Sequence, residues 1–365
     1  MVIHKDINRK TKMKILVLGG AGFVGANLCI HLSKCGHNVT CFDNLVRGGV
    51  ENNLQELKNN SIEIIRGDIR NPEDFNKITS KPDCVLLCAA QPSATNYSNP
   101  VFDVTNNTYG VLNTLAKVRE WDASLIFWST NKCYSGNLCN SISLIEHESK
   151  MWVDLTQEPM VGYDPLYGFN EQLSIDGNDR SIYGVSKAMS DILIQEWSNA
   201  FKVRSIINRF SCLSGPRQWG LAEQGWVAWF AIANELNLPI EIFGFKGKQV
   251  RDNLYVSDLC ELIEKQIIAL ESKEFHGEVF NVGGGVGNTI SLLEAMEILE
   301  TKNKKFWKKS YYDQPRRADQ CVYFSDIRKV KNTFDWQPKI NPEEGYNLIL
   351  EWVKENKSKL ESMYK

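Results

Sequence analysis

The sequence predicts an α/β protein with one large domain, built on a doubly wound parallel sheet, and a smaller α/β lobe. Three observations lead to this prediction. Short apolar runs alternate with helical patterns, a glycine-rich turn follows the first apolar run, and the alternation breaks down after about residue 210. Strands that alternate with helices are typical of β-α-β units, in which helices cover both faces of a parallel sheet.

Six apolar runs are the predicted strands of that sheet. In chain order they read KILVLGG, NVTCFDN, IEIIRGD, DCVLLCAA, ASLIFWST and RSIINRF. Helical periodicity fills the segment GFVGANLCIHLSKC and stops at Gly36, and further helices are expected around 106–120 and 184–200. Their alternation with the strands predicts that the sheet is parallel.

Beyond residue 210, glycine and proline become frequent in runs such as LSGPRQWG and NVGGGVGN. Irregular segments then separate the helices, which indicates a second, smaller lobe. We therefore predict a polar N-terminal tail, a large domain in two pieces and the lobe in two further pieces. The predicted boundaries are 1–12 for the tail, 13–209 and 250–285 for the large domain, and 210–249 and 286–365 for the lobe.

The composition excludes several classes of protein. The formal net charge is −2, so no basic surface is expected for nucleic acid or for an anionic membrane. No apolar stretch approaches the roughly 20 residues of a membrane-spanning helix. The ten cysteines contain no C-x-x-C pair and no metal-binding spacing, so we expect reduced thiols, a cytoplasmic protein and no metal site.

The run Gly19-Gly-Ala-Gly22-Phe-Val-Gly25 has the spacing G-x-x-G-x-x-G between a predicted strand and a predicted helix. Such glycines let the backbone approach a pyrophosphate, whose charge the helix N-terminus favours. Asp43 ends the next strand, where its carboxylate can accept hydrogen bonds from both ribose hydroxyls and repel a 2′-phosphate. The large domain is therefore predicted to be a Rossmann domain that binds NAD rather than NADP.

Two more strand ends belong to this predicted cofactor site. Asp68 ends the third strand, where it can reach the adenine edge, and a turn or cap residue is the other interpretation. The run CAAQ ends the fourth strand and offers small residues where the cofactor would pass.

Tyr183 and Lys187 form a Y-x-x-x-K pair at the start of a predicted helix. The i, i+4 spacing puts both side chains on one face. A nearby ammonium is expected to lower the phenol's pKa, so that the tyrosine takes and returns a hydroxyl proton near neutral pH. The lysine can also hold the nicotinamide ribose. Such a pair is common on helices and indicates little alone. Here it indicates a catalytic site because the glycine turn, the two strand-end carboxylates and a strand-end threonine, Thr130, accompany it.

Together these features resemble the extended short-chain dehydrogenase/reductases that act on nucleotide-sugars. The resemblance runs from Met13 to the C-terminus and includes GDI, AAQ, Asn107-x-x-Gly110, GKQVRDNLYVSD, FNVGG and RRADQ. It implies a catalytic triad of Thr130, Tyr183 and Lys187. It also implies that the residues in contact with NAD are Gly19, Gly22, Phe23, Val24, Asp43, Asn44, Arg47, Asp68, Ile69, Ala89, Ala90, Gln91, Asn107, Tyr183, Lys187 and Phe210.

The same resemblance implies a diphosphate-linked sugar as substrate. Arg251 and Arg316 would hold the diphosphate, a role that suits guanidinium groups. The implied substrate contacts are Asn131, Lys132, Cys212, Gln224, Arg251 and Arg316.

The run Trp128-Ser-Thr-Asn-Lys-Cys-Tyr134 limits which of the family's reactions are expected. Dehydratases of this family carry Asp-Glu after the threonine as an acid/base pair, and decarboxylases carry a glutamate at the second position. Asn131 and Lys132 cannot supply that pair, so reversible oxidation without elimination is expected. STNKCY, GFNEQLSID, GPRQWGLAEQGWVAWF and the small residue Cys212 resemble the subgroup that epimerises CDP-paratose at C2.

Two other functions remain open at this point. One is a C4 epimerase or C4 dehydrogenase of a UDP- or GDP-sugar with the same triad, and the other is a non-catalytic nucleotide sensor. The helices around 106–120 and 184–200 resemble the pair that joins subunits in this family, so a homodimer or homotetramer is expected. For Lys132 we expect contact with the substrate, the alternative being a surface lysine paired with a loop carboxylate such as Glu171.

Overall fold

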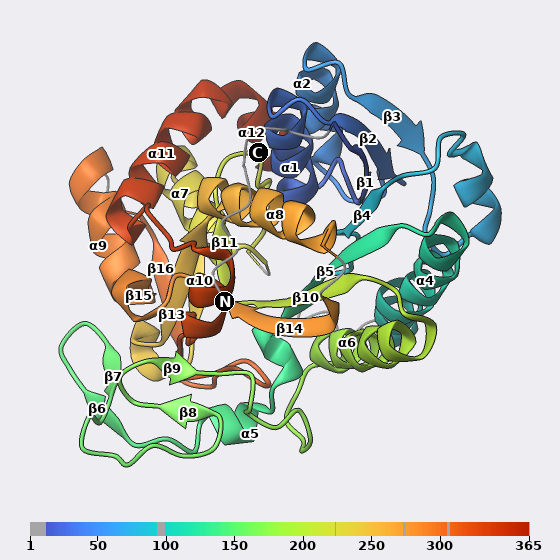
Figure 1. Cartoon of the computed structure of the whole chain (residues 1–365). Coiled ribbons are helices and arrows are strands. Elements are labelled where there is room, and N and C mark those ends of the chain that lie inside the picture. Colours follow the sequence, from blue (N-terminus) through green and yellow to red (C-terminus); the bar gives the residue numbers. More distant parts are fainter. Residues whose placement is uncertain (1–11, 93–98, 223, 273–274, 305–306, 365) are drawn as a thin grey trace.

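The computed structural model describes residues 12–92, 99–222, 224–272, 275–304 and 307–364, so the predicted tail lies outside it apart from Lys12. A seven-stranded sheet forms the larger layer, with every neighbouring pair of strands parallel (Figure 1). The strand order is β14-β10-β5-β4-β1-β2-β3. The strands are β1 Lys14–Leu18, β2 Asn38–Asp43, β3 Glu63–Arg66, β4 Cys84–Leu87, β5 Ser124–Thr130, β10 Ser205–Phe210 and β14 His276–Val282.

Alternating residues of the sheet pack into two separate cores. In β1, Ile15 and Val17 face one core, and Leu16 and Leu18 face the other, as the two-residue period of a strand requires. The first core contains residues of α1, α8 and α10, and the second contains residues of α4 and α6. Helices therefore cover both faces, and the predicted doubly wound α/β fold is confirmed. The helices are α1 Phe23–Lys34, α2 Leu54–Asn59, α3 Pro100–Val104, α4 Gly110–Trp121, α6 Ile182–Phe201, α8 Val256–Leu270 and α10 Arg328–Phe334.

The helix predicted around 106–120 is longer than expected and irregular. It begins with α3, passes through a π-helical turn at Thr105–Tyr109 and continues as α4. A π-helical turn inserts an extra residue into the helix and often marks a functional position. Here it contains Asn107.

The smaller lobe is built on a second sheet. Its four strands are β11 Cys212–Ser214, β13 Val250–Tyr255, β15 Thr289–Ser291 and β17 Val322–Tyr323, and a separate pair joins β12 Ile240–Phe243 to β16 Lys309–Tyr312. Helices α7 and α11 share an apolar core with α9 and α12. These helices are α7 Trp226–Leu236, α9 Leu292–Asn303, α11 Pro342–Glu355 and α12 Lys357–Tyr364.

Short elements complete the described chain. Two hairpins and one short helix lie below the sheets in Figure 1. They are β6 Leu144–Glu146 with β7 Met151–Val153, β8 Tyr163–Asp164 with β9 Gly168–Phe169, and α5 Gly136–Cys139. The 3₁₀ turns are Val50–Asn53, Pro72–Lys77, Asn131–Cys133, Phe245–Gly247 and Val286–Asn288.

The chain passes between the two sheets more than once. Strand β13, in the segment that the sequence analysis places in the large domain, pairs with the strands of the smaller sheet. Its buried Asp252 accepts hydrogen bonds from the Ser211 hydroxyl and, at 3.1 Å each, from the backbone N–H groups of Gly285 and Ser325. One carboxylate therefore ties together the connection from β10 to β11, the connection from β14 to β15 and the segment that follows β17.

None of the ten cysteines forms a disulfide. In the described part of the chain, every helix is too short or too polar to cross a membrane.

Candidate active site

The turn between β1 and α1 requires glycine at two positions. Gly19 has φ +79°, and a Cβ there would lie 2.6 Å from the Ala89 nitrogen. A Cβ on Gly25 would lie 2.1 Å from the Gly19 carbonyl oxygen, so strand and helix could not approach as they do. The close approach points the free N–H groups of the first turn of α1 toward the ends of the neighbouring strands.

A cavity of about 470 Å³ opens at these strand ends. It lies where the sheet order reverses between β1 and β4, the position at which doubly wound sheets bind ligands. The predicted site residues that line it are Gly19, Gly22, Phe23, Val24, Asp43, Asn44, Arg47, Ile69, Ala89, Ala90, Gln91 and Gln224.

The cavity also has a wall that the sequence analysis did not assign to the cofactor. Arg217, Gln218 and Trp219 come from the smaller lobe. The indole of Trp219 donates to Asn53 at 2.9 Å, and the Arg217 guanidinium pairs with Glu56. These three residues belong to the run GPRQWG, which in the sequence indicated only the subgroup resemblance. Its arginine and tryptophan could have suggested a contact with the cofactor.

Of the two predicted strand-end carboxylates, Asp43 lines the cavity, whereas Asp68 does not, although its neighbours Gly67 and Ile69 do. Asp43 accepts hydrogen bonds from the backbone N–H groups of Ala21 at 3.0 Å and Leu45 at 2.8 Å, one on each oxygen, while burial raises the pKa of its carboxyl. Each oxygen keeps a second lone pair for a ribose hydroxyl. Asp68 stands beside the cavity wall and is paired with Arg70 at 2.6 Å, which is the main reason that its pKa falls to about 2.

Asn107 connects the cofactor cavity to the helix that carries Tyr183. Its side-chain oxygen accepts from the Gln91 N–H at 2.7 Å, and its amide donates to the Gln91 carbonyl at 2.9 Å and to the Ser186 hydroxyl at 3.0 Å. Ser186 lies between Tyr183 and Lys187 in α6. Asn107 therefore fixes the end of β4 relative to the catalytic helix, although it does not line the cavity itself. Phe210 also lies outside the lining and stacks on Trp128 in the core, with ring centroids 5.6 Å apart.

Two members of the predicted triad, Thr130 and Tyr183, meet at the end of β5 and the start of α6, and Lys187 follows one turn further along α6. Thr130 is hydrogen-bonded to the Tyr183 hydroxyl, and the Lys187 ammonium lies 4.1 Å from the centroid of the Phe127 ring. The Ser181 side chain caps α6 by accepting from the Gly184 N–H at 3.0 Å, which sets where the helix begins.

Burial is the largest influence on the pKa of both Tyr183 and Lys187. It raises the pKa of Tyr183 to about 12, against the opposing effect of the Thr130 hydrogen bond. It also lowers the pKa of Lys187, whose side chain is 2% exposed, to about 7. The expectation that the ammonium lowers the phenol's pKa is therefore wrong for this structure, because loss of hydration dominates for both groups.

The predicted substrate residues converge on the segment 318–320. Lys132 donates to the Ala318 carbonyl at 3.0 Å, and Arg251 pairs with Asp319 at 2.6 Å. Asn131 donates to the Gln320 side chain at 3.1 Å. Of the other predicted residues, Cys212 is partly exposed in β11, and Arg316 lies over the Phe243 ring and donates to the Ala222 carbonyl.

Lys132 lies near a loop carboxylate, as the alternative interpretation expected, but that carboxylate is Asp319 and not Glu171. Glu171 accepts from the Asn281 N–H at 2.6 Å, and Lys132 faces Asp319, whose nearer oxygen is 3.7 Å away.

These residues fit a dinucleotide with a hydride-carrying end. The glycine turn, the helix N-terminus and Asp43 suit a pyrophosphate and an unphosphorylated ribose, and Asn107 leads from that site toward the buried triad. The comparisons with known proteins agree with this assignment.

Residues 15–283 match the NAD dependent epimerase/dehydratase family. The chain is similar to the CDP-paratose 2-epimerase of Salmonella typhi, with 33% identity over 93% of this chain and 99% of the relative. It is 29% identical to a putative UDP-glucose 4-epimerase of Methanocaldococcus jannaschii, over 94% of this chain and 99% of the relative.

Solved structures give the same result. The UDP-glucuronic acid 4-epimerase of Bacillus cereus, in complex with UDP-glucuronic acid and NAD, superposes with a TM-score of 0.73 at 26% identity and covers 94% of this chain and 99% of its own. The UDP-glucose 4-epimerase of Thermotoga maritima, with UDP-glucose, gives 0.74 at 26% identity with the same coverage. The chain therefore belongs to the NAD dependent epimerase/dehydratase family, as a nucleotide-sugar epimerase whose cofactor is NAD.

Proposed function

We propose that this epimerase acts at C2 of a CDP-linked 3,6-dideoxyhexose, as a CDP-paratose 2-epimerase. The observation that carries the proposal is the pair that follows Thr130. Asn131 and Lys132 replace the carboxylates that elimination requires, and both are bonded to the segment 318–320. The 33% identity to the Salmonella typhi enzyme supports the choice of sugar and nucleotide.

The chain's own residues supply proton transfer and orientation. Tyr183, as the phenolate, accepts the proton of the C2 hydroxyl, and the hydrogen on C2 leaves as hydride to give a 2-keto sugar. When bound, NAD would supply the hydride acceptor, and inversion requires that the 2-keto sugar present its opposite face when the hydride comes back to C2. Tyr183 then gives the proton back to the C2 oxygen, so that only the configuration at C2 changes.

Thr130 and Lys187 assist that proton transfer. Thr130 hydrogen-bonds the phenol oxygen and thereby lowers the pKa of Tyr183. Lys187, one helical turn further along α6, would hold the nicotinamide ribose and stabilise the phenolate when protonated. A sensor would have no use for this arrangement, so we do not favour a non-catalytic role.

A C4 epimerase of a UDP-sugar is the second candidate, because the Methanocaldococcus jannaschii relative carries that name at 29% identity. In a 3,6-dideoxyhexose the C2 and C4 hydroxyls both flank a methylene. The choice between them therefore depends on how the lobe orients the ring. The predicted contacts Cys212, Gln224, Arg251 and Arg316 would set that orientation.

We also propose a homodimer in the cytoplasm. Exposed apolar side chains gather on the outer faces of α3, the π-helical turn, α4 and α6, and a second copy of the same faces would cover them. The ten cysteines, none of which forms a disulfide, suit a reducing compartment. The exposed apolar residues are Val101, Tyr109, Leu112, Val185, Met189 and Ile192.

The test is incubation of the purified enzyme with CDP-, UDP-, GDP- and dTDP-sugars in deuterated buffer, followed by NMR at C2 and C4. We expect inversion at C2 of the CDP-sugar without deuterium at that carbon, because the hydride stays on the cofactor between half-reactions. Inversion at C4 would support the second candidate instead. Deuterium at the inverted carbon would contradict the hydride mechanism for either sugar.

A further inference from the structure

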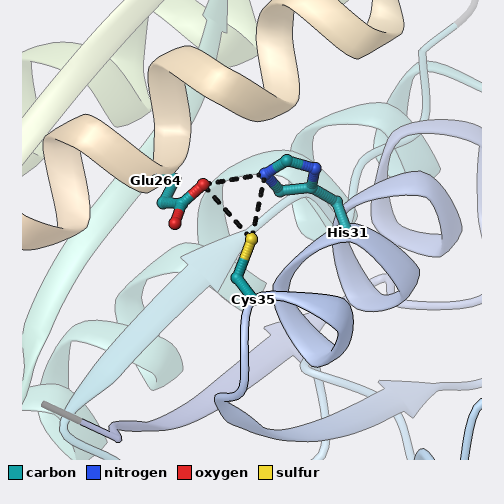
Figure 2. Close-up of side chains that lie close together, drawn as sticks. All are labelled: His31, Cys35 and Glu264. Carbon is teal, nitrogen blue, oxygen red and sulfur yellow. Dashed lines mark hydrogen bonds and ion pairs between the residues drawn. The ribbon is translucent and has the colours of Figure 1, made fainter. Parts of the chain in front are cut away.

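Three potential metal ligands meet far from the cavity, between α1 and α8. His31 and Cys35 are four residues apart at the C-terminal end of α1, so they share one face of the helix. Glu264 approaches from α8. Figure 2 shows the three side chains pointing toward one another, with the His31 Nε2, Cys35 Sγ and Glu264 Oε2 atoms at the corners of a triangle.

The contacts do not form a proton relay. In a Cys-His-Glu relay the thiol and the carboxylate would contact different nitrogens of the imidazole. Here the Glu264 oxygen lies 3.1 Å and the Cys35 sulfur 3.6 Å from the same nitrogen, Nε2. One ring nitrogen carries one proton or one lone pair, and the Cys35 thiol instead donates to the same Glu264 oxygen at 3.3 Å. A cation bound by all three atoms would replace these hydrogen bonds.

The size of the triangle suits a zinc ion. Zinc lies about 2.0–2.1 Å from imidazole nitrogen, about 2.3 Å from thiolate sulfur and about 2.0–2.2 Å from carboxylate oxygen, in tetrahedral geometry. These bond lengths give ligand-to-ligand distances of roughly 3.3–3.6 Å. The observed separations are 3.6 Å between sulfur and nitrogen and 3.3 Å between sulfur and oxygen, and the nitrogen–oxygen separation of 3.1 Å is slightly short and would have to open when an ion enters.

The surroundings favour a cation as well. The ligands of α1 lie in its last turn and at its C-cap, where the helix dipole presents its negative end. The His31 and Glu264 side chains are 29% and 19% exposed, so an ion can enter and a water molecule can complete its coordination.

We propose that His31, Cys35 and Glu264 bind a zinc ion with water as the fourth ligand, and that this ion ties α1 to α8. The ion takes no part in the sugar chemistry, because it lies at the opposite end of α1 from the glycine turn. A search for paired cysteines misses it, since the pattern is H-x-x-x-C with a carboxylate 229 residues later.

The test uses cobalt(II) chloride added to purified enzyme that has been treated with a chelator. A tetrahedral site with one thiolate gives intense visible d–d absorption and a sulfur-to-metal charge-transfer band in the near ultraviolet. We expect both bands to saturate at one equivalent of cobalt and to disappear when zinc is added. Absence of the tetrahedral bands in the wild-type enzyme would overturn the proposal.

The variants identify the ligands. Cys35→Ser should remove the charge-transfer band, and His31→Gln and Glu264→Gln should weaken cobalt binding by more than the roughly 10- to 100-fold that a lost second-shell contact costs. The control is His147→Gln, which changes an exposed histidine and should leave both bands intact. A charge-transfer band that persists in Cys35→Ser would show that another of the ten cysteines binds the metal, and would refute the site.

A second measurement does not depend on the variants folding. Zinc should raise the Tm of the wild-type enzyme, and a chelator should reverse the increase, because an ion that binds only the folded state stabilises it. A Tm that does not respond to zinc would contradict a clamp between α1 and α8. Both measurements are made without turnover, so they stand apart from the proposed sugar specificity.

Discussion

Arg251 and Asp319 form an ion pair whose nitrogen and oxygen atoms lie 2.6 Å apart. The same carboxylate oxygen is 3.7 Å from the Lys132 ammonium, so one anion holds two cations at the edge of the candidate substrate site. The group has a net positive charge and is largely shielded from water, which suits a diphosphate. An incoming phosphate would compete with Asp319 for both cations.

Lys132→Met should raise KM for the nucleotide-sugar, because it removes one of these cations while keeping the bulk of the side chain. NAD content should not change, and no dehydratase product should form. The control is Lys248→Met, since Lys248 also donates to a carboxylate and a carbonyl, those of Glu146 and His147. Steady-state kinetics of both variants decide the matter, and an unaltered KM and kcat for Lys132→Met would refute its contact with substrate.

Tyr183→Phe should reduce kcat by about 10²- to 10⁴-fold, because it removes the group that transfers the proton. The purified variant should still carry NAD, since the cavity is unchanged, and ultraviolet spectra of denatured samples measure this content. Tyr163→Phe is the control: within the described chain the Tyr163 hydroxyl is buried and has no hydrogen-bond partner. Near-wild-type turnover in Tyr183→Phe would disprove its catalytic role.

Thr130→Val should move the pH dependence of kcat to higher pH. The ionised fraction of Tyr183 rises with pH below its pKa of about 12, and the Thr130 hydrogen bond lowers that pKa. Removing the bond raises the pKa, so activity at a fixed neutral pH should fall. Rates measured from about pH 6 to about pH 10 would show the displacement.

The control for this profile is Thr114→Val, whose hydroxyl donates to the Gly110 carbonyl inside α4. Its profile should coincide with that of the wild type. A Thr130→Val profile that also coincides would mean that Thr130 does not act through the phenol.

Ile192→Glu should convert the proposed dimer to monomers, because it places a charge in the exposed apolar face of α6. Ile268→Glu is a matched control on α8: the two isoleucines are 51% and 52% exposed. Light scattering at micromolar concentration measures the mass of each variant. A wild-type monomer, or a dimer that persists in Ile192→Glu, would exclude this face as the interface.

Local spacing allowed much of the cofactor site to be predicted. The glycine turn and Asp43 depend on residues close to one strand end, and the structure places both at the cavity. The pKa of Tyr183 could not be predicted in the same way, because an i, i+4 spacing shows that a lysine is near but not how completely both groups are buried. The direction of the shift was therefore wrong.

Contacts between segments that lie far apart in the chain could not be predicted from the sequence either. Asp319 meets Arg251 and Lys132 only after the smaller lobe has folded against β5, and nothing in RRADQ indicates which cations its carboxylate holds. Glu171 carried the right charge to pair with Lys132, but the fold places it on the backbone of Asn281. Phe210 ends a strand, as a cofactor contact would, yet its ring packs against Trp128.

The position of Asp252 has a consequence for how the protein unfolds. Its carboxylate joins segments near residues 211, 285 and 325, so the connections from β10 to β11 and from β14 to β15 are anchored to the same buried anion as the segment that follows β17. A fragment that lacked any one of these segments would leave the buried charge short of a donor, which is costly. The two sheets should therefore melt together in one cooperative transition, and a protease should yield no stable half-molecule.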